Sequence, residues 1–166
     1  VDAPLTTIPG HGDGEPVMKI PQPDGWDRVT LMDSELIRFT MRNIGLVNDG
    51  FASTAVVTLE SVRGNSDAEE VFAGQHAALD GLGATDLQIT QHTLCGLPAE
   101  TLTYITPAMG PLSPHPAMVV CAVLQTDDTT FAMTVTVQTA DSGNPEYQRD
   151  SETILTGFQM LPPTDG

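Results

Sequence analysis

Two cysteines and one nearby histidine are the residues best suited by type to do chemistry in this chain. Cys95 lies three residues after His92 in the stretch HTLCGLP, and Cys121 lies within the apolar run PAMVVCAVL. A reactive thiolate needs a positive neighbourhood, and His92 is the only such group in the stretch around Cys95. The alternative that we favour is a disulfide between Cys95 and Cys121, which predicts an oxidising compartment outside the cytoplasm.

Motifs for catalysis, metals and cofactors are missing from the sequence. Neither cysteine belongs to a CxxC pair or has a histidine at zinc-ligand spacing. No GxSxG, phosphate-binding GK[ST], HExxH or calcium-loop motif occurs, and the GLG triplet at 81–83 lacks the third glycine of a dinucleotide site. The histidines are dispersed, so a triad would have to be assembled by the fold: they are His11, His76, His92 and His115. We therefore expect no metal, no cofactor and no enzyme activity.

The charge balance of the chain is strongly acidic. Six Lys and Arg stand against 22 Asp and Glu, for a formal net charge of -16 in 166 residues. A field of this sign repels phosphate backbones, which argues against nucleic acid as a partner. The length predicts one domain with a single core over residues 17–161, and the ends predict a flexible arm over 1–16 and a frayed tail over 162–166.

The elements that position these residues can be expected from periodicity and turn signals. Strands are predicted over 17–20, 35–43, 53–62, 86–94, 99–106, 117–125 and 130–139. One helix is predicted from the capping-box pair Ser66 and Glu69 to about Asp80, and a second from Asn144 and Pro145 to Gly157. This order predicts an α+β fold, with an antiparallel sheet and two helices packed on one of its faces.

Two residues are candidates for the rim of a ligand site. Trp26 follows the PQPDG turn, where its ring either closes one end of the core or, partly exposed, floors a groove for a sugar or acyl chain. Met109 lies in a proline-rich loop, and loops at the rim of a sheet often carry function. Met118, Phe131 and Met133 either line a hydrophobic cavity or pack in the core.

Four short motifs, in the order IPQPDGW, CGLPAETLTY, TFAMTVTV and ILTGFQM, carry a family resemblance over residues 17–161. Together they resemble the LpqN/LpqT-type mycobacterial lipoproteins and the related secreted proline-rich antigen. The resemblance implies a PsbP-like α/β sandwich and no established enzyme activity. It also implies export to the cell envelope. No lipobox cysteine stands near the first residue, so a lipid anchor is unsupported, and a transmembrane anchor or plain secretion fits the resemblance as well.

The resemblance implies a function in the mycobacterial-type envelope. Members are associated with envelope biogenesis, through contacts with mycolic-acid export machinery or glycolipids, and with host interaction. We therefore expect a non-catalytic extracytoplasmic module, secreted or anchored, that binds an envelope protein or glycolipid. The alternative is a hydrolase acting on envelope lipids or esters, which would need a Ser or Cys beside a His in a cleft.

Overall fold

The computed structural model describes residues 4–10, 14–31, 33–48, 51–64, 67–108, 114–126, 128–139 and 143–162. Neither helix in this part of the chain is long and apolar enough to cross a membrane. In chain order the elements are β1 (Leu5–Thr7), β2 (Val17–Pro21), β3 (Asp27–Val29), β4 (Ile37–Asn48), β5 (Phe51–Arg63), α1 (Ala68–Leu82), β6 (Thr85–Leu94), β7 (Leu97–Ile105), β8 (Pro116–Gln125), β9 (Thr129–Gln138), α2 (Pro145–Gly157) and β10 (Gln159–Leu161).

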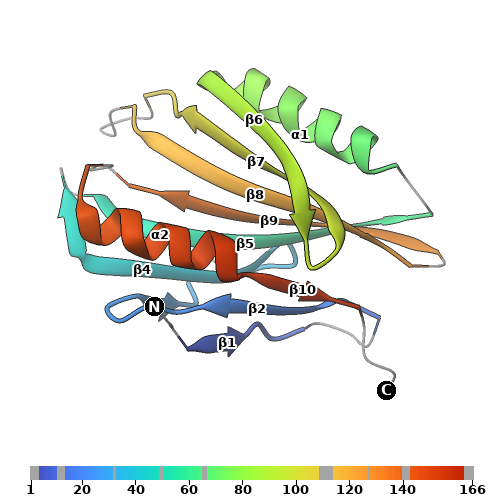
Figure 1. The fold of residues 1–166 in the computed structure, drawn as a ribbon, viewed down its shortest axis with the longest axis horizontal. Coiled ribbons are helices and arrows are strands. Elements are labelled where there is room, and N and C mark those ends of the chain that lie inside the picture. Colours follow the sequence, from blue (N-terminus) through green and yellow to red (C-terminus); the bar gives the residue numbers. More distant parts are fainter. Residues whose placement is uncertain are drawn as a thin grey trace.

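Strands β3 to β9 form one antiparallel sheet in the order β3-β4-β5-β9-β8-β7-β6 (Figure 1). At its centre β5 pairs with β9 over ten residues, from Thr54 opposite Gln138 to Arg63 opposite Thr129. The alternation predicted for β9 is confirmed, because each of its expected core residues is buried. These residues are Phe131, Met133, Val135 and Val137.

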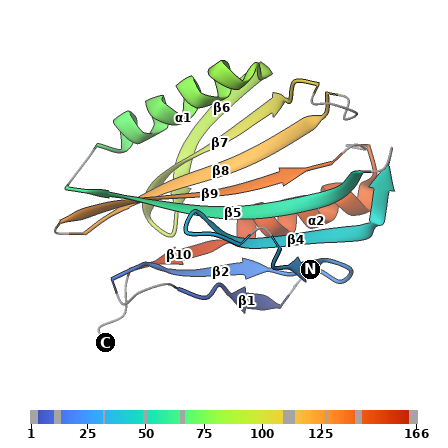
Figure 2. The same ribbon diagram turned by 180° about the vertical axis from the view of Figure 1, so that it is seen from behind.

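The α+β class is confirmed, but the prediction that both helices pack on one face of the sheet is wrong. Successive side chains of a strand point to opposite faces, and on β8 each face has its own helix. The residues that pack with the α1 side chains Phe72 and Leu79 are Val119, Cys121 and Val123. Those in the core with α2 are Val120, Ala122 and Leu124. Accordingly, α2 lies in front of the sheet in Figure 1 and behind it in Figure 2.

The residue before each helix takes the N-cap position and marks where the helix begins. The Asn144 side-chain oxygen accepts hydrogen bonds from the backbone N–H of Glu146 at 2.9 Å and of Tyr147 at 3.3 Å, which confirms the predicted start of α2 at Pro145. The predicted cap of α1, Ser66, lies outside the described residues. Asp67 takes the N-cap position, with no side-chain capping bond.

A second, three-stranded sheet corrects the prediction of a flexible arm over residues 1–16 for the part of it that the structure describes, residues 4–10 and 14–16. Its order is β1-β2-β10, and β1 pairs with β2 from Leu5 opposite Pro21 to Thr7 opposite Lys19. Ile8 is buried, and Glu15 forms a two-bond ion pair with Arg38 at 2.7 and 2.8 Å. The described part of the segment is therefore held by strand pairing, by burial of Ile8 and by the Glu15–Arg38 ion pair. The predicted tail at 162–166 lies outside the described residues, apart from Pro162.

The main core lies between the large sheet, α2 and the small sheet. Trp26 belongs to it and is only 2 % exposed, and its indole Nε1 donates to Asp150 Oδ2 on α2 at 2.9 Å. The ring therefore ties the turn before β3 to α2 across the edge of the sheet. This is the first of the two roles considered for Trp26. The second, a partly exposed ring that floors a groove, is wrong.

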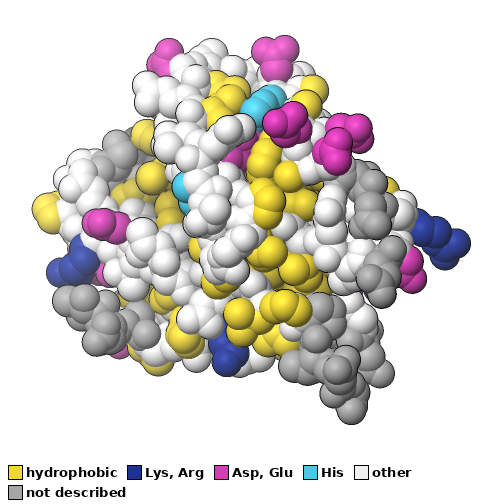
Figure 3. Space-filling view, turned by 45° about the vertical axis from the view of Figure 1, so that its right-hand side comes forward, with side chains coloured by type: hydrophobic (Ala, Val, Ile, Leu, Met, Phe, Trp, Pro, Cys, Tyr) yellow, Lys and Arg dark blue, Asp and Glu magenta, His cyan; other side chains and the backbone are white. Residues whose placement is uncertain are grey.

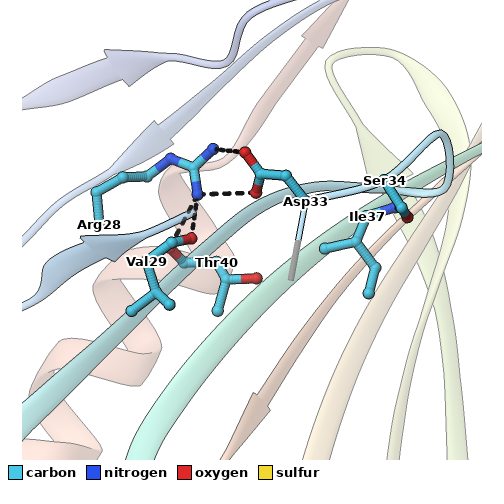
Figure 4. A network of polar contacts seen from close by, with 6 residues as sticks. All are labelled: Arg28, Val29, Asp33, Ser34, Ile37 and Thr40. Carbon is cyan, nitrogen blue, oxygen red and sulfur yellow. Dashed lines mark hydrogen bonds and ion pairs between the residues drawn. The ribbon is translucent and has the colours of Figure 1, made fainter. Parts of the chain in front are cut away.

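Polar contacts of Arg28 gather at the β3 edge of the large sheet (Figure 4). Arg28 forms an ion pair with Asp33, with bonds of 2.7 and 3.1 Å, and its guanidinium lies 4.5 Å from the centre of the Phe39 ring. The same guanidinium donates to the carbonyl oxygens of Val29 and Thr40. β3 has only three residues, so the edge strand itself is short, and the charged Arg28 lies on it.

Candidate functional site

A groove of about 670 Å³ lies between α2 and strands β6 to β8 on the α2 face of the large sheet. We call it the α2 groove. Its floor is apolar: the sheet contributes Leu94, Met118 and Val120, and α2 contributes Tyr147 and Leu155. The volume is in the range of small-molecule sites in proteins.

The groove exists because one helix cannot cover the face of so wide a sheet. Seven strands spaced about 4.8 Å apart make a sheet roughly 29 Å across, whereas a helix with its side chains is about 10 Å wide. α2 and the small sheet cover the β4 and β5 side, where Ala55 and Val57 are fully buried. The apolar strip on β6 to β8 is left open beside α2.

Polar groups line the rim of the α2 groove. His92 Nε2 lies 2.7 Å from Thr101 Oγ1, and His92 Nδ1 lies 3.2 Å from the Thr93 carbonyl oxygen. A carbonyl only accepts, so this contact places the proton of a neutral imidazole on Nδ1 and leaves Nε2 to accept from Thr101. On α2, Ser151 Oγ donates to the Gln148 carbonyl oxygen at 3.1 Å. His92 and Ser151 both line the groove, but each is hydrogen-bonded to another group and not to the other.

The rim favours a neutral polar ligand group over an anionic one. The described lining contains one acid, Glu152, and no Lys or Arg. The Tyr147 hydroxyl is neutral and able to donate near pH 7, because the ordinary pKa of tyrosine already lies well above 7 and burial raises the pKa of Tyr147 further. An alkyl chain with a hydroxylated head matches an apolar floor with such a rim.

The predicted site residues are only partly brought together. Met118, considered as a cavity-lining residue, lines the α2 groove, whereas Met133 is buried in the core. Met109 lies outside the described residues, and Trp26 is buried away from the lining. Tyr147 and Leu155 were missed as lining residues. The sequence placed them on the core stripe of α2, and that stripe does not indicate where the helix overhangs open space.

The predicted disulfide is wrong, because both cysteines are free thiols and lie far apart along the strand direction of the sheet. Leu94 pairs with Leu97, so Cys95 lies in the turn of the β6–β7 hairpin. Cys121 lies opposite Glu100, which is three residues after Leu97 on β7. At about 3.3 Å per residue this is roughly 10 Å along the strand, beyond the Cα separation of about 7 Å that a disulfide can span.

The two thiols are expected to differ sharply in reactivity. Burial, with Glu100 and then Glu60 adding to it, raises the pKa of Cys121 to about 12, whereas Cys95 is exposed. Iodoacetamide should therefore label Cys95 alone in the native protein near neutral pH, and label both thiols in guanidinium chloride. Intact mass of the protein checks this. A native mass two hydrogens below that of the reduced protein, or two labels without denaturant, would contradict it.

A buried ionisable pair lies on the opposite, α1 face. Glu100 of β7 is fully buried, and its Oε1 lies 2.6 Å from Nε2 of His76, in the middle of α1. Its Oε2 is buried with no hydrogen-bond partner among the described residues. Glu100 and Thr101 are neighbours on β7, so one lies under α1 and the other lines the α2 groove. No group of three or more potential metal ligands occurs in the described ranges.

Comparisons with known proteins show that the fold of this chain is similar to that of solved structures. No family model and no curated protein matches the chain. The crystal structure of LpqN, described as involved in cell envelope biogenesis of Mycobacterium tuberculosis, matches with a TM-score of 0.75 at 17 % identity, over 96 % of this chain and 91 % of that one. The Ran-binding protein Mog1p of Saccharomyces cerevisiae matches with a TM-score of 0.54 at 15 % identity, over 97 % of each chain. The PsbP-like fold is thereby confirmed, and the resemblance to the LpqN family is supported at the level of fold.

Proposed function

We propose that this protein is a non-catalytic, extracytoplasmic binding module of the cell envelope that holds the alkyl part of an envelope glycolipid in the α2 groove. The observation that carries the proposal is the apolar floor beneath a rim without Lys or Arg. Apolar surface supplies affinity for an alkyl chain, and the hydroxyl and imidazole groups of the rim supply partners for a sugar. The likeness in fold to LpqN supports the envelope setting.

Alkyl glucosides of increasing chain length, kept below their micelle concentrations, test this function. Each added methylene that enters the groove should tighten binding about fourfold, since burying one CH₂ contributes roughly 0.8 kcal/mol. Alkyl sulfates of the same length should bind more weakly, because the described lining contains the acid Glu152 and no Lys or Arg. Calorimetric titration measures both series.

A matched pair of variants on α2 distinguishes binding in the groove from non-specific binding elsewhere on the protein. Glu152 lines the groove and Glu146 does not, and both are exposed. Glu152→Trp should weaken binding of the longest glucoside at least tenfold by filling the mouth, while Glu146→Trp should leave it unchanged. Affinity that ignores chain length, or falls equally in both variants, would remove the groove as the site.

A hydrolase acting on envelope lipids or esters is the second candidate function. The observation behind it is the distance of 2.7 Å between His92 Nε2 and Thr101 Oγ1 on the wall of the groove, within the reach of a base that activates a hydroxyl. Release of nitrophenol from nitrophenyl octanoate tests it. Turnover that disappears in both His92→Gln and Thr101→Val would replace the binding function with this one.

A further inference from the structure

Strand β6 leaves one edge of the large sheet open. It is ten residues long, it pairs with β7 alone in the sheet order of the described strands, and eight of its residues are exposed. Along such an edge every second residue turns its backbone N–H and C=O away from the sheet. An edge of this length is a template for a further strand.

The usual protections of an edge are nearly absent from β6. Proteins blunt an edge with Lys, Pro, a bulge or a very short strand. The other edge, β3, has three residues and is crossed by Arg28. On β6 the sequence TDLQITQHTL contains no Lys, Arg or Pro, and the one irregularity falls between Thr85 and Gln88, where Asp86 has a φ of 56°. The stretch from Gln88 to Leu94 pairs regularly.

The charge around this edge has a single sign. All Lys and Arg of the chain fall outside residues 64–148: they are Lys19, Arg28, Arg38, Arg42, Arg63 and Arg149. The exposed acids of α1, of its N-cap and of β6 itself are Asp67, Glu69, Glu70, Asp80 and Asp86. Figure 3 shows Asp and Glu over the upper part of the molecule, where α1 and β6 lie in Figure 1, and also at its sides, whereas Lys and Arg are seen only at the sides and below.

From this edge and this charge we propose that β6 is a docking strand for an extended segment of a partner protein that carries Lys or Arg. The segment adds beside β6 as an eighth strand of the large sheet. Backbone hydrogen bonds supply the affinity, as in other cases of strand addition, and the acidic surface selects a basic segment. A second copy of this chain is the poorer occupant, because each copy carries a net charge of -16.

Three end-blocked synthetic peptides of nine residues test the charge and the strand requirement. The first alternates lysine with threonine and valine, the second has glutamate in place of lysine, and the third has two prolines at central positions. The lysine peptide should bind, more weakly as salt rises, and should slow hydrogen exchange of alternate amides in residues 88–94. The glutamate and proline peptides should not bind.

Two matched isoleucines provide the variant and its control. Ile89 on β6 is 43 % exposed, and Ile44 on β4, near the other end of the sheet, is 64 % exposed. Ile89→Lys should weaken the lysine peptide about tenfold or more, and Ile44→Lys, with the same change in charge, should leave its affinity within about twofold. Circular dichroism and urea unfolding confirm that both variants are folded.

Several results would overturn the proposal. Absence of binding by the lysine peptide would do so, as would equal weakening by Ile89→Lys and Ile44→Lys, which would mean diffuse attraction to an acidic protein. Binding without slowed exchange in β6 would place the peptide elsewhere. A dimer of the free protein that Ile89→Lys dissociates, measured by light scattering, would assign the edge to a second copy.

Discussion

His76→Ala is expected to lower the free energy of unfolding by about 3 kcal/mol. The substitution leaves the Glu100 carboxylate buried in the α1 face without the imidazole that lies 2.6 Å from its Oε1. Removing one partner of a buried pair typically costs about 3–5 kcal/mol. We expect the lower end of that range because 32 % of the His76 side chain is exposed to water. Urea unfolding followed by circular dichroism measures the loss.

Two further variants separate this pair from ordinary histidine contacts. His92→Ala removes a histidine that is also hydrogen-bonded, but on the exposed edge strand, and should cost less than about 1 kcal/mol. The double variant His76→Leu with Glu100→Met replaces both partners with apolar groups, and should recover most of the stability or exceed that of the wild type. A loss in His76→Ala no larger than in His92→Ala would contradict the buried-pair account.

Trp26→Ala is expected to cost about 4 kcal/mol, the second large effect. The ring is almost fully buried in the main core, and its loss leaves both a cavity and an Asp150 carboxylate without its indole donor. Truncation of a buried aromatic residue alone typically costs about 3–5 kcal/mol. Trp26→Phe keeps most of the ring and should lose about 1–3 kcal/mol, mainly through the missing hydrogen bond. Thermal and urea unfolding provide the comparison.

The control for Trp26 is a large apolar residue outside the core. Leu31 is 92 % exposed, so Leu31→Ala should change stability by no more than about 0.5 kcal/mol. Trp26 is the only tryptophan, so its fluorescence in the wild type reports the contact of the turn with α2. If fluorescence changed at lower urea than circular dichroism, that contact would open before global unfolding and the Trp26–Asp150 tie would be weak.

Sequence patterns predicted the long elements because their signals are local. Asn144 and Pro145 mark a helix start whatever the tertiary structure, and the alternation in β9 needs only one buried face. The three-residue strands β1 and β10 have no room for periodicity, so their pairing with β2 could not be expected from the sequence. The same shortness made residues 1–16 look like a flexible arm.

The prediction that both helices pack on one face of the sheet was the larger error, although the sequence of β8 indicates that both faces are covered. β8 reads as a continuous apolar run, and a strand buried on one face alone would alternate with polar residues. The run indicates burial on both faces, which requires a helix on each side. The α2 groove could not be predicted in this way, because it depends on which part of the sheet α2 fails to cover. The disulfide failed for a similar reason: the register of β7 and β8 decides the distance between Cys95 and Cys121.

The central pairing of β5 with β9 has a consequence for the order in which the chain folds. Strands β6 to β9 follow one another in space as they do in sequence, so this meander can form from local contacts. β5 must instead close a long loop, because Arg63 pairs with Thr129 and Thr54 with Gln138. Until it arrives, β9 is an open edge rich in valine and threonine and without a single Lys or Arg. Self-association through the β9 edge is therefore a hazard of that interval, and pairing with β5 ends it.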